Sequence, residues 1–245
     1  MLTNFRSSRA TKIAVVFSGF LTLGLGPAAA DTVTVAPSIS VTRRTFDAPI
    51  NEQPFFGFAA KSETQTAADR KFIETFEKQG DRKSGAIAVE KNGWDAIWDG
   101  DYALAARRLN QAWLLDPGRS PTVHGFAMIA DRRFKDREYA EELFRLAATL
   151  KTPLPTLEGD HARLYLALGE PGKAIPLLET ALKKIPSLGY KIDLAKAYRQ
   201  AGDLQGACRM VRDIEQAMKA EPRRDYGSIA TDARRLGEAA KCALN

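Results

Sequence analysis

The chain has two histidines, His124 and His161, and they are the first candidates for catalysis or metal binding. They lack the paired His or Cys spacing that a zinc site needs. The acidic residues are scattered, and no two are spaced as an acid–base pair, which is typical of solvated helix faces. Residues 31–245 contain no nucleophile elbow, P-loop, dinucleotide fingerprint, HExxH motif or calcium loop. The sequence therefore predicts no catalytic, cofactor or metal site, and a protein that is not an enzyme.

Two tryptophans, Trp94 and Trp98, lie one helical turn apart with Ile97 beside them, so they form one stripe on an expected helix. Trp combines a large contact area with one hydrogen-bond donor, and such a pair can form a platform for a peptide or a sugar ring. The same stripe is also compatible with packing against the preceding segments of the chain. Both interpretations remain open from the sequence.

The stretch from Gly100 to Pro117 carries a pattern that returns three more times. Gly100 favours the end of one helix, Asp101 is a good N-cap for the next, and small and large apolar residues follow on one face. The same order begins again at residues 135, 169 and 202, so successive copies start 33 to 35 residues apart. The small–large–small positions are Ala105, Leu109 and Ala112; Ala140, Phe144 and Ala147; Ala174, Leu178 and Ala181; and Ala207, Val211 and Ile214.

This period and packing pattern resemble the tetratricopeptide repeat over about residues 86 to 222. The resemblance implies an all-α, right-handed solenoid of about four helix-turn-helix repeats, in which the first helices line a concave groove. The matching first-helix positions are Gly93 with Ala96, Ala162 with Tyr165, and Ala195 with Tyr198, and Met128 and Asp131 are the counterparts in the second repeat.

The resemblance also implies which side chains line the groove. Arg captures carboxylates through two parallel hydrogen bonds, so the cations at these positions predict an acidic segment or a chain-terminal carboxylate as ligand. A solvated basic face is the alternative. The expected groove residues are Trp94, Ile97, Trp98, Arg132, Arg133, Arg163, Lys196 and Arg199.

The first thirty residues have the pattern of a secretory signal peptide. Arg6, Arg9 and Lys12 precede an apolar run over 13–25, and Ala28–Ala30 form a cleavage site before Asp31. The run is shorter than the roughly 20 residues of a membrane anchor. We therefore expect cleavage after Ala30, export to the periplasm, and no membrane span in the mature chain.

The formal net charge is +6, but the signal peptide carries three basic and no acidic residues, which leaves +3 for the mature chain. Export and this nearly balanced charge argue against nucleic acid as a partner.

Segments outside the repeats are expected to serve as arm and caps. Residues 31–64 are rich in Thr, Ser, Pro and Val without a helical period, which predicts an extended or disordered arm. Its aromatic patch at 53–58 either docks on the first hairpin or binds a partner. Residues 65–84 predict an N-terminal capping helix with Ala68, Phe72, Ile73 and Phe76 on one face, 85–222 hold the repeats, and 223–245 predict a C-terminal capping helix.

The two cysteines, Cys208 and Cys242, are expected to form a disulfide, because an exported chain meets an oxidising compartment. The expected helices are antiparallel, but their lengths leave a mismatch of roughly 7 Å, which a tilt or an uneven turn must absorb.

The sequence favours a non-catalytic periplasmic scaffold, an adaptor or assembly factor, that holds an extended and acidic segment of another envelope protein. The alternative is a carbohydrate-binding or polysaccharide-secretion accessory protein that uses Trp94 and Trp98. The pathway and the oligomeric state have no sequence signature.

Overall fold

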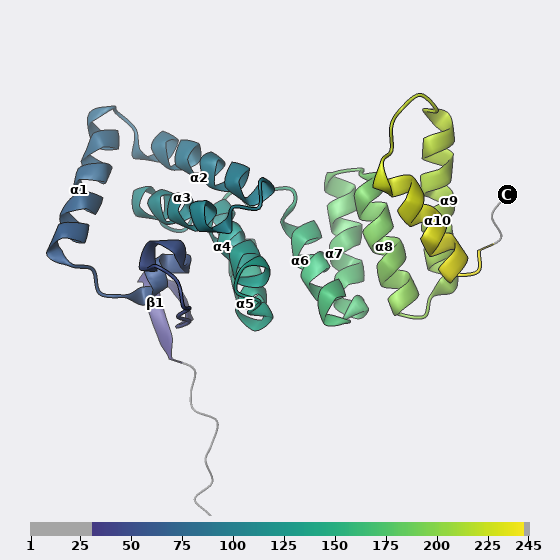
Figure 1. The fold of residues 1–245 in the computed structure, drawn as a ribbon, viewed down its shortest axis with the longest axis horizontal. Helices are drawn as coiled ribbons and strands as arrows, with labels where there is room; N and C mark the ends of the chain where they lie inside the picture. The colour runs from purple at the N-terminus through teal and green to yellow at the C-terminus, as the bar shows by residue number, and fades with distance from the viewer. Residues whose placement is uncertain (1–30, 243–245) are drawn as a thin grey trace, which may run out of the picture. The chain divides into compact units, whose positions relative to one another are not determined.

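The computed structural model describes residues 31–242, and the expected signal peptide lies outside this range. Within the described residues the fold is all-α apart from one short β-hairpin (Figure 1). The helices are α1 Glu63–Lys78, α2 Arg82–Trp98, α3 Tyr102–Leu115, α4 Ser120–Arg132, α5 Arg137–Thr149, α6 Leu157–Leu168, α7 Pro171–Lys184, α8 Leu188–Gln200, α9 Leu204–Ala220 and α10 Ser228–Ala239.

Helices α2 to α9 form four successive hairpins, each pairing a first helix with the second helix that follows it. The turn within each hairpin places a residue in the left-handed region, namely Gly100, Lys135, Gly169 and Gly202, with φ of 77°, 59°, 73° and 81°. Glycine reaches this region without steric cost, which explains three of the four residues. Asp101, Asp136 and Asp203 follow as N-caps, and each carboxylate accepts a hydrogen bond from a backbone N–H of the next turn.

The repeat pattern of the sequence is confirmed by burial. All twelve small–large–small residues of the second helices are fully buried or nearly so. Alanine at the flanking positions lets helices approach closely, and the larger residue between them fills the space. Each first helix also contacts the next first helix along the chain, as a tetratricopeptide-like helical repeat requires.

The second hairpin has a turn that is one residue longer than the others. In the other three hairpins the N-cap N–H bonds a carbonyl five residues back, as from Asp101 to Ala96, whereas Asp136 bonds Ala130, six residues back. Ala127 and Ala130, both fully buried, therefore take the small positions that the sequence pattern assigned to Met128 and Asp131. A shift of one residue turns a helix by about 100°. The first-helix positions predicted for α4 from the repeat are therefore wrong by one residue.

Residues 31–62 are folded onto the repeats, unlike the extended or disordered arm that the sequence predicts. Strands β1 Thr32–Ala36 and β2 Ile39–Thr42 form an antiparallel hairpin, and two short 3-10 turns follow, η1 Ile50–Glu52 and η2 Pro54–Phe58. These elements contact α3, α4 and α5. The prediction from sequence is wrong here because the segment has no regular period, and only tertiary contacts order it.

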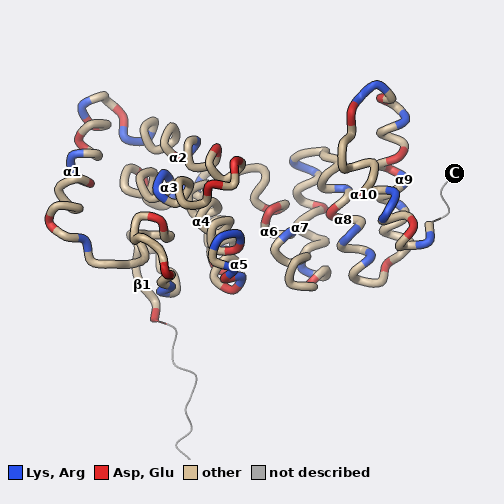
Figure 2. The backbone as a smooth tube through the Cα atoms, viewed as in Figure 1, with Lys and Arg blue, Asp and Glu red and all other residues tan. Residues whose placement is uncertain are grey.

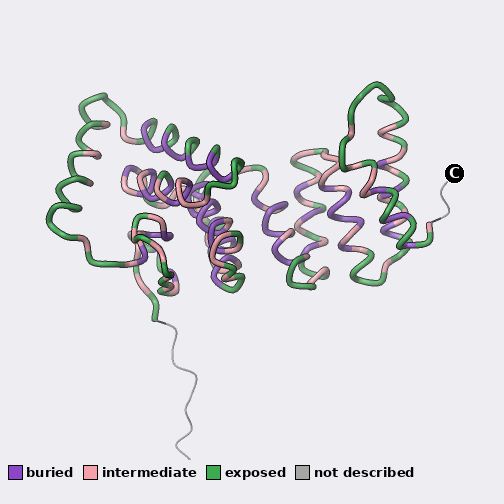
Figure 3. Tube along the Cα trace, viewed as in Figure 1, coloured by how far each residue is buried: buried purple, intermediate pink, exposed green. Residues whose placement is uncertain are grey.

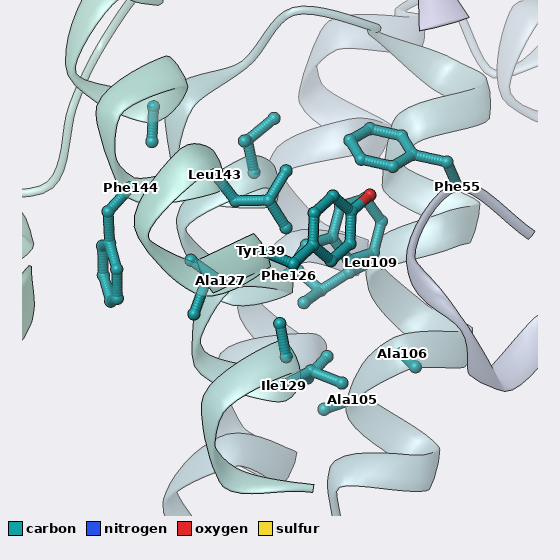
Figure 4. Packing of buried hydrophobic residues seen from close by; sticks show 14 of the residues in the cluster. Phe55, Ala105, Ala106, Leu109, Phe126, Ala127, Ile129, Tyr139, Leu143 and Phe144 are labelled. Carbon is teal, nitrogen blue, oxygen red and sulfur yellow. The ribbon is translucent and has the colours of Figure 1, made fainter. Parts of the chain in front are cut away.

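The aromatic patch of this segment enters the main core. The Phe55 ring packs edge-on against Trp113 and Phe126, with ring centroids 5.0 and 4.8 Å away, and Figure 4 shows it pointing into the cluster around Leu109. Residues 55 to 58 all have positive φ, which costs about 1–2 kcal/mol for each residue other than glycine.

Asn110 on α3 offsets part of this strain by binding three backbone groups of the segment. Its Oδ1 accepts from Phe56 N–H, and its Nδ2 donates to the carbonyls of Asn51 and Gln53.

Helix α1 begins with a capping box in which Ser62 and Gln65 exchange hydrogen bonds. Phe72, Ile73 and Phe76 are partly buried against a small cluster of α2 and α3 residues, while Ala68 on the expected apolar face is exposed. Figure 3 shows exposed backbone along most of α1 and buried segments along α2 to α5. Helix α10 contacts both α8 and α9.

Candidate functional site

The expected aromatic platform on α2 is not formed by both tryptophans. Trp94 is buried: its Nε1 donates to the Pro121 carbonyl at 3.2 Å, and its ring lies edge-on to His124. Ile97 is buried as well, whereas Trp98 is 72% exposed. One ring of the pair is therefore available to a ligand.

The two expected groove arginines of the second repeat are engaged by carboxylates. Arg133 pairs with Glu52 at 2.7 Å, and Arg107 also pairs with Glu52. The hydrogen bond from Arg133 is the main cause that holds the pKa of the Glu52 carboxyl below its usual value. Arg132 pairs with Asp131 at 3.2 Å. The longer turn after α4 explains why neither arginine lies at its predicted position. Asp131 takes the position that the repeat pattern predicts for a cation, and Arg133 lies next to the folded N-terminal segment.

Two further expected groove cations belong to a ladder of ion pairs along the first helices. Arg163 bonds Asp160 at 3.0 Å and Asp193 at 2.8 Å, and Lys196 lies 3.7 Å from Asp193. Asp160 also lies within hydrogen-bonding distance of His124, with its Oδ2 3.2 Å from the ring Nε2. Asp160 and Asp193 lie three residues before Arg163 and Lys196, about one helical turn away, so these two cations already have carboxylate partners on their own helices.

A cleft of about 370 Å³ lies at the C-terminal end of the repeats, between α6, α8 and α10. Leu166, Leu236 and Ala239 supply its apolar lining. Figure 2 shows basic segments on both α8 and α10. The polar lining consists of three cations, one carboxylate and one amide, namely Lys196, Arg199, Arg235, Asp232 and Gln200.

Two cations of this cleft, Arg199 and Arg235, have no carboxylate within 4.0 Å among residues 31–242. They differ in this from Arg132, Arg133 and Arg163. The sequence predicts Lys196 and Arg199 as groove residues but not Arg235, because it predicts only a capping role for α10. Residues 223–245 predict a helix, but nothing local to this segment indicates that it lies against α8.

The histidines lie inside the stack of first helices. His161 stacks between Phe144 and Tyr165, with ring centroids 5.0 and 4.6 Å away. Burial is the main cause that lowers the pKa of His161 to about 4, so its ring is neutral at pH 7. Within the described part of the chain, no group of three or more His, Cys, Asp or Glu side chains could hold a metal ion.

A second buried polar group joins α2 to α4. Glu90 accepts two hydrogen bonds from Arg119, both at 3.1 Å, and one from the Thr122 hydroxyl at 2.8 Å. The carboxylate is buried with its partners in place, so its charge is compensated. This group and the ladder of Asp160 and Asp193 fix how the first helices stack.

Cys208 and Cys242 are joined by a disulfide, with Cα atoms 5.4 Å apart. Helix α10 spans 12 residues, so its length is close to the α9 segment between Cys208 and Ala220. The chain then turns back at Lys241, with φ of 53°, and the Cys242 N–H bonds the Gly237 carbonyl. A shorter α10 and this final turn absorb the mismatch that the expected helix lengths left.

No family model and no curated protein matches the chain. A solved structure described as "MamA RS-1 ArsTM double mutant" is similar over 66% of this chain and 96% of that chain, with 13% sequence identity and a TM-score of 0.47. The helical-repeat assignment therefore rests on the hairpins themselves. None of the helices in residues 31–242 is both long and apolar enough to cross a membrane.

Proposed function

We propose that this protein is a non-catalytic periplasmic interaction scaffold, an adaptor or assembly factor, that binds an extended acidic segment of another cell-envelope protein. The observation that carries the proposal is the cleft between α6, α8 and α10. It combines three cations with one carboxylate, and Arg199 and Arg235 lack a carboxylate partner among the described residues. The proposal places binding at this cleft rather than in the earlier part of the expected groove, where Arg132, Arg133 and Arg163 pair with carboxylates.

The chemistry of the cleft selects the class of ligand. Guanidinium groups from α8 and α10 approach it from two helices, which suits carboxylates at more than one position of a segment. Leu166 and Leu236 provide an apolar surface for one hydrophobic side chain of the same segment. An extended acidic peptide with an apolar anchor satisfies both features.

Export is supported by two independent features. The first thirty residues carry the signal-peptide pattern, and a disulfide such as Cys208–Cys242 forms in oxidising compartments such as the periplasm.

Binding of a labelled peptide of alternating Asp, Glu and Leu residues tests the cleft. We expect wild-type affinity to weaken as salt rises, because exposed charges are screened. The double variant Arg199→Gln/Arg235→Gln should bind about tenfold more weakly, since two exposed ion pairs contribute up to about 1 kcal/mol each. Arg223→Gln/Arg234→Gln removes two exposed cations outside the cleft and should bind as wild type. Equal affinities of both variants would remove the cleft from the function.

The carbohydrate alternative retains one supporting observation, the exposed ring of Trp98. Two experiments separate the two functions. The first measures glycan-array binding by wild type and Trp98→Ala. The second is a pull-down from periplasmic extract with wild type and Arg199→Gln/Arg235→Gln. The carbohydrate function would replace the proposed scaffold function if two results came together: glycan binding is lost in Trp98→Ala, and no protein is captured in a way that depends on Arg199 and Arg235.

A further inference from the structure

The Cys208–Cys242 disulfide lines an open pocket of about 420 Å³ between α9 and the end of α10. Both cysteines are partly exposed. An outside thiol can therefore approach the bond without unfolding of the helices. Exposed disulfides have higher reduction potentials than structural ones, and they are more often labile or regulatory.

Cations surround this disulfide. Arg209, Arg212 and Lys241 line the same pocket, and no acidic residue belongs to its lining. The carboxylate of Asp203, outside the lining, lies 3.8 Å from Arg209. Positive charge next to a cysteine favours the thiolate and makes it a better leaving group in thiol–disulfide exchange. The pocket therefore favours opening of the bond by a thiol reagent.

The bond holds α10 in place at its C-terminal end. Few α10 residues are buried, namely Ala233, Leu236 and Gly237, and the connection before it, residues 221–227, contains no described helix. The Tyr226 hydroxyl, just before α10, lies 3.3 Å from the carbonyl oxygens of Ala217 and Glu221, at the end of α9. The disulfide is thus the covalent attachment of a helix with a small packed face.

Helix α10 is also one wall of the proposed binding cleft. Asp232, Arg235, Leu236 and Ala239 all belong to it, and they face Lys196 and Arg199 of α8. Arg235 is one of the two cations there without a carboxylate partner in the described chain. Any change that loosens α10 therefore removes one side of the cleft.

We propose that the Cys208–Cys242 disulfide is a redox switch that controls the binding cleft, an inference that rests on the proposed function. A thiolate of a dithiol reductant attacks one sulfur of the bond, forms a mixed disulfide, and releases the other cysteine as a thiolate that takes up a proton. The second thiol of the reductant then attacks the mixed disulfide and frees the first cysteine. Two electrons and two protons pass to the cysteines, and the dithiol becomes a disulfide. Helix α10 then leaves α8 and the cleft opens.

The full chain, produced under oxidising conditions, tests the switch with dithiothreitol as the dithiol. Free thiols are counted by alkylation and mass spectrometry, and hydrogen exchange is followed over 228–239 and over α8. We expect two free thiols, faster exchange in α10, and unchanged exchange in the buried part of α5. A disulfide that opens only when the whole chain unfolds, or α10 exchange that stays the same after opening, would overturn the switch.

Two sets of variants make the test specific. Cys208→Ser/Cys242→Ser should reproduce the fast exchange of α10 without reductant, and reductant should change it no further. Arg209→Gln/Arg212→Gln should slow opening several-fold, while Arg223→Gln/Arg234→Gln should open at the wild-type rate. A serine variant with wild-type exchange in α10, or equal opening rates in both arginine variants, contradicts the proposal.

Peptide binding separates this switch from the proposed function. Binding by the oxidised chain that reduction lowers at least tenfold supports both. Binding that survives reduction overturns the switch and leaves the scaffold function standing. If the oxidised chain does not bind the acidic peptide, the proposed function fails, and the exchange of α10 still decides whether the disulfide controls that helix.

Discussion

His161 makes the stability of this protein dependent on pH. The ring is buried on α6 between Phe144 and Tyr165, and burial lowers its pKa from 6.5 to about 4. Glu141 and Glu158 oppose this shift, and Arg145 and His124 add to it, but burial is the largest cause. Between these two pKa values the unfolded chain binds a proton that the folded chain does not. The contribution of His161 is thus fully present above pH 6.5 and is lost as pH falls toward 4.

The magnitude follows from the shift. One pKa unit corresponds to about 1.4 kcal/mol, so a shift from 6.5 to about 4 is worth up to about 3 kcal/mol. Replacing His161 with Phe keeps an aromatic ring between its two neighbours and removes the titration. Urea unfolding of wild type and His161→Phe, followed by circular dichroism at pH 7, 6, 5 and 4, gives two curves of unfolding free energy against pH.

We expect wild type to lose about 2 to 3 kcal/mol more than His161→Phe between pH 7 and pH 4. Carboxylates titrate in both proteins and cancel in the difference. Tyr165→Phe is the matched control, because it removes the hydroxyl that donates to Glu141 at 2.9 Å but leaves His161 in place. Its curve should run parallel to wild type. Parallel curves for wild type and His161→Phe would refute burial as the cause of the pH dependence.

Three substitutions test the packing. Ala174→Leu at a fully buried position should lower stability by about 1–3 kcal/mol through overpacking, whereas Ala167→Leu at an exposed position should be neutral in thermal unfolding. Gly125→Ala places a Cβ 2.5 Å from a Leu109 side-chain carbon and should lower stability by a similar amount, while a Cβ at the control position Gly172 meets no atom within 4 Å. Equal unfolding midpoints of the two variants would contradict the close approach of α3 to α4 at Gly125. Asn110→Ala leaves buried backbone groups unpaired, so it should lower the free energy of unfolding by about 1–3 kcal/mol and speed proteolysis within residues 43–61. Unchanged cleavage would show that packing alone holds this segment.

The candidate site was only partly visible in the sequence. Lys196 and Arg199 were identified because the repeat period places equivalent residues on equivalent faces. The ion pair of Arg133 could not be identified in the same way, because its partner Glu52 is 81 residues away along the chain. The sequence carried one sign of the shift in α4, because Asp131 stands where the repeat usually packs an aromatic side chain. The extra residue in the turn, which rotates the helix by about 100°, was not predicted.

The sequence by itself determined the repeat: an apolar period of three to four residues and a turn with an Asp or Glu N-cap recur in every hairpin, and such signals are local. It also determined that the two cysteines can meet, as they belong to consecutive antiparallel segments. Tertiary structure alone decided which cations stay without a carboxylate partner, how residues 43–58 fold onto α3, and that α10 completes a cleft with α6 and α8. These outcomes depend on contacts between residues far apart in the chain, and no local pattern encodes such a pairing.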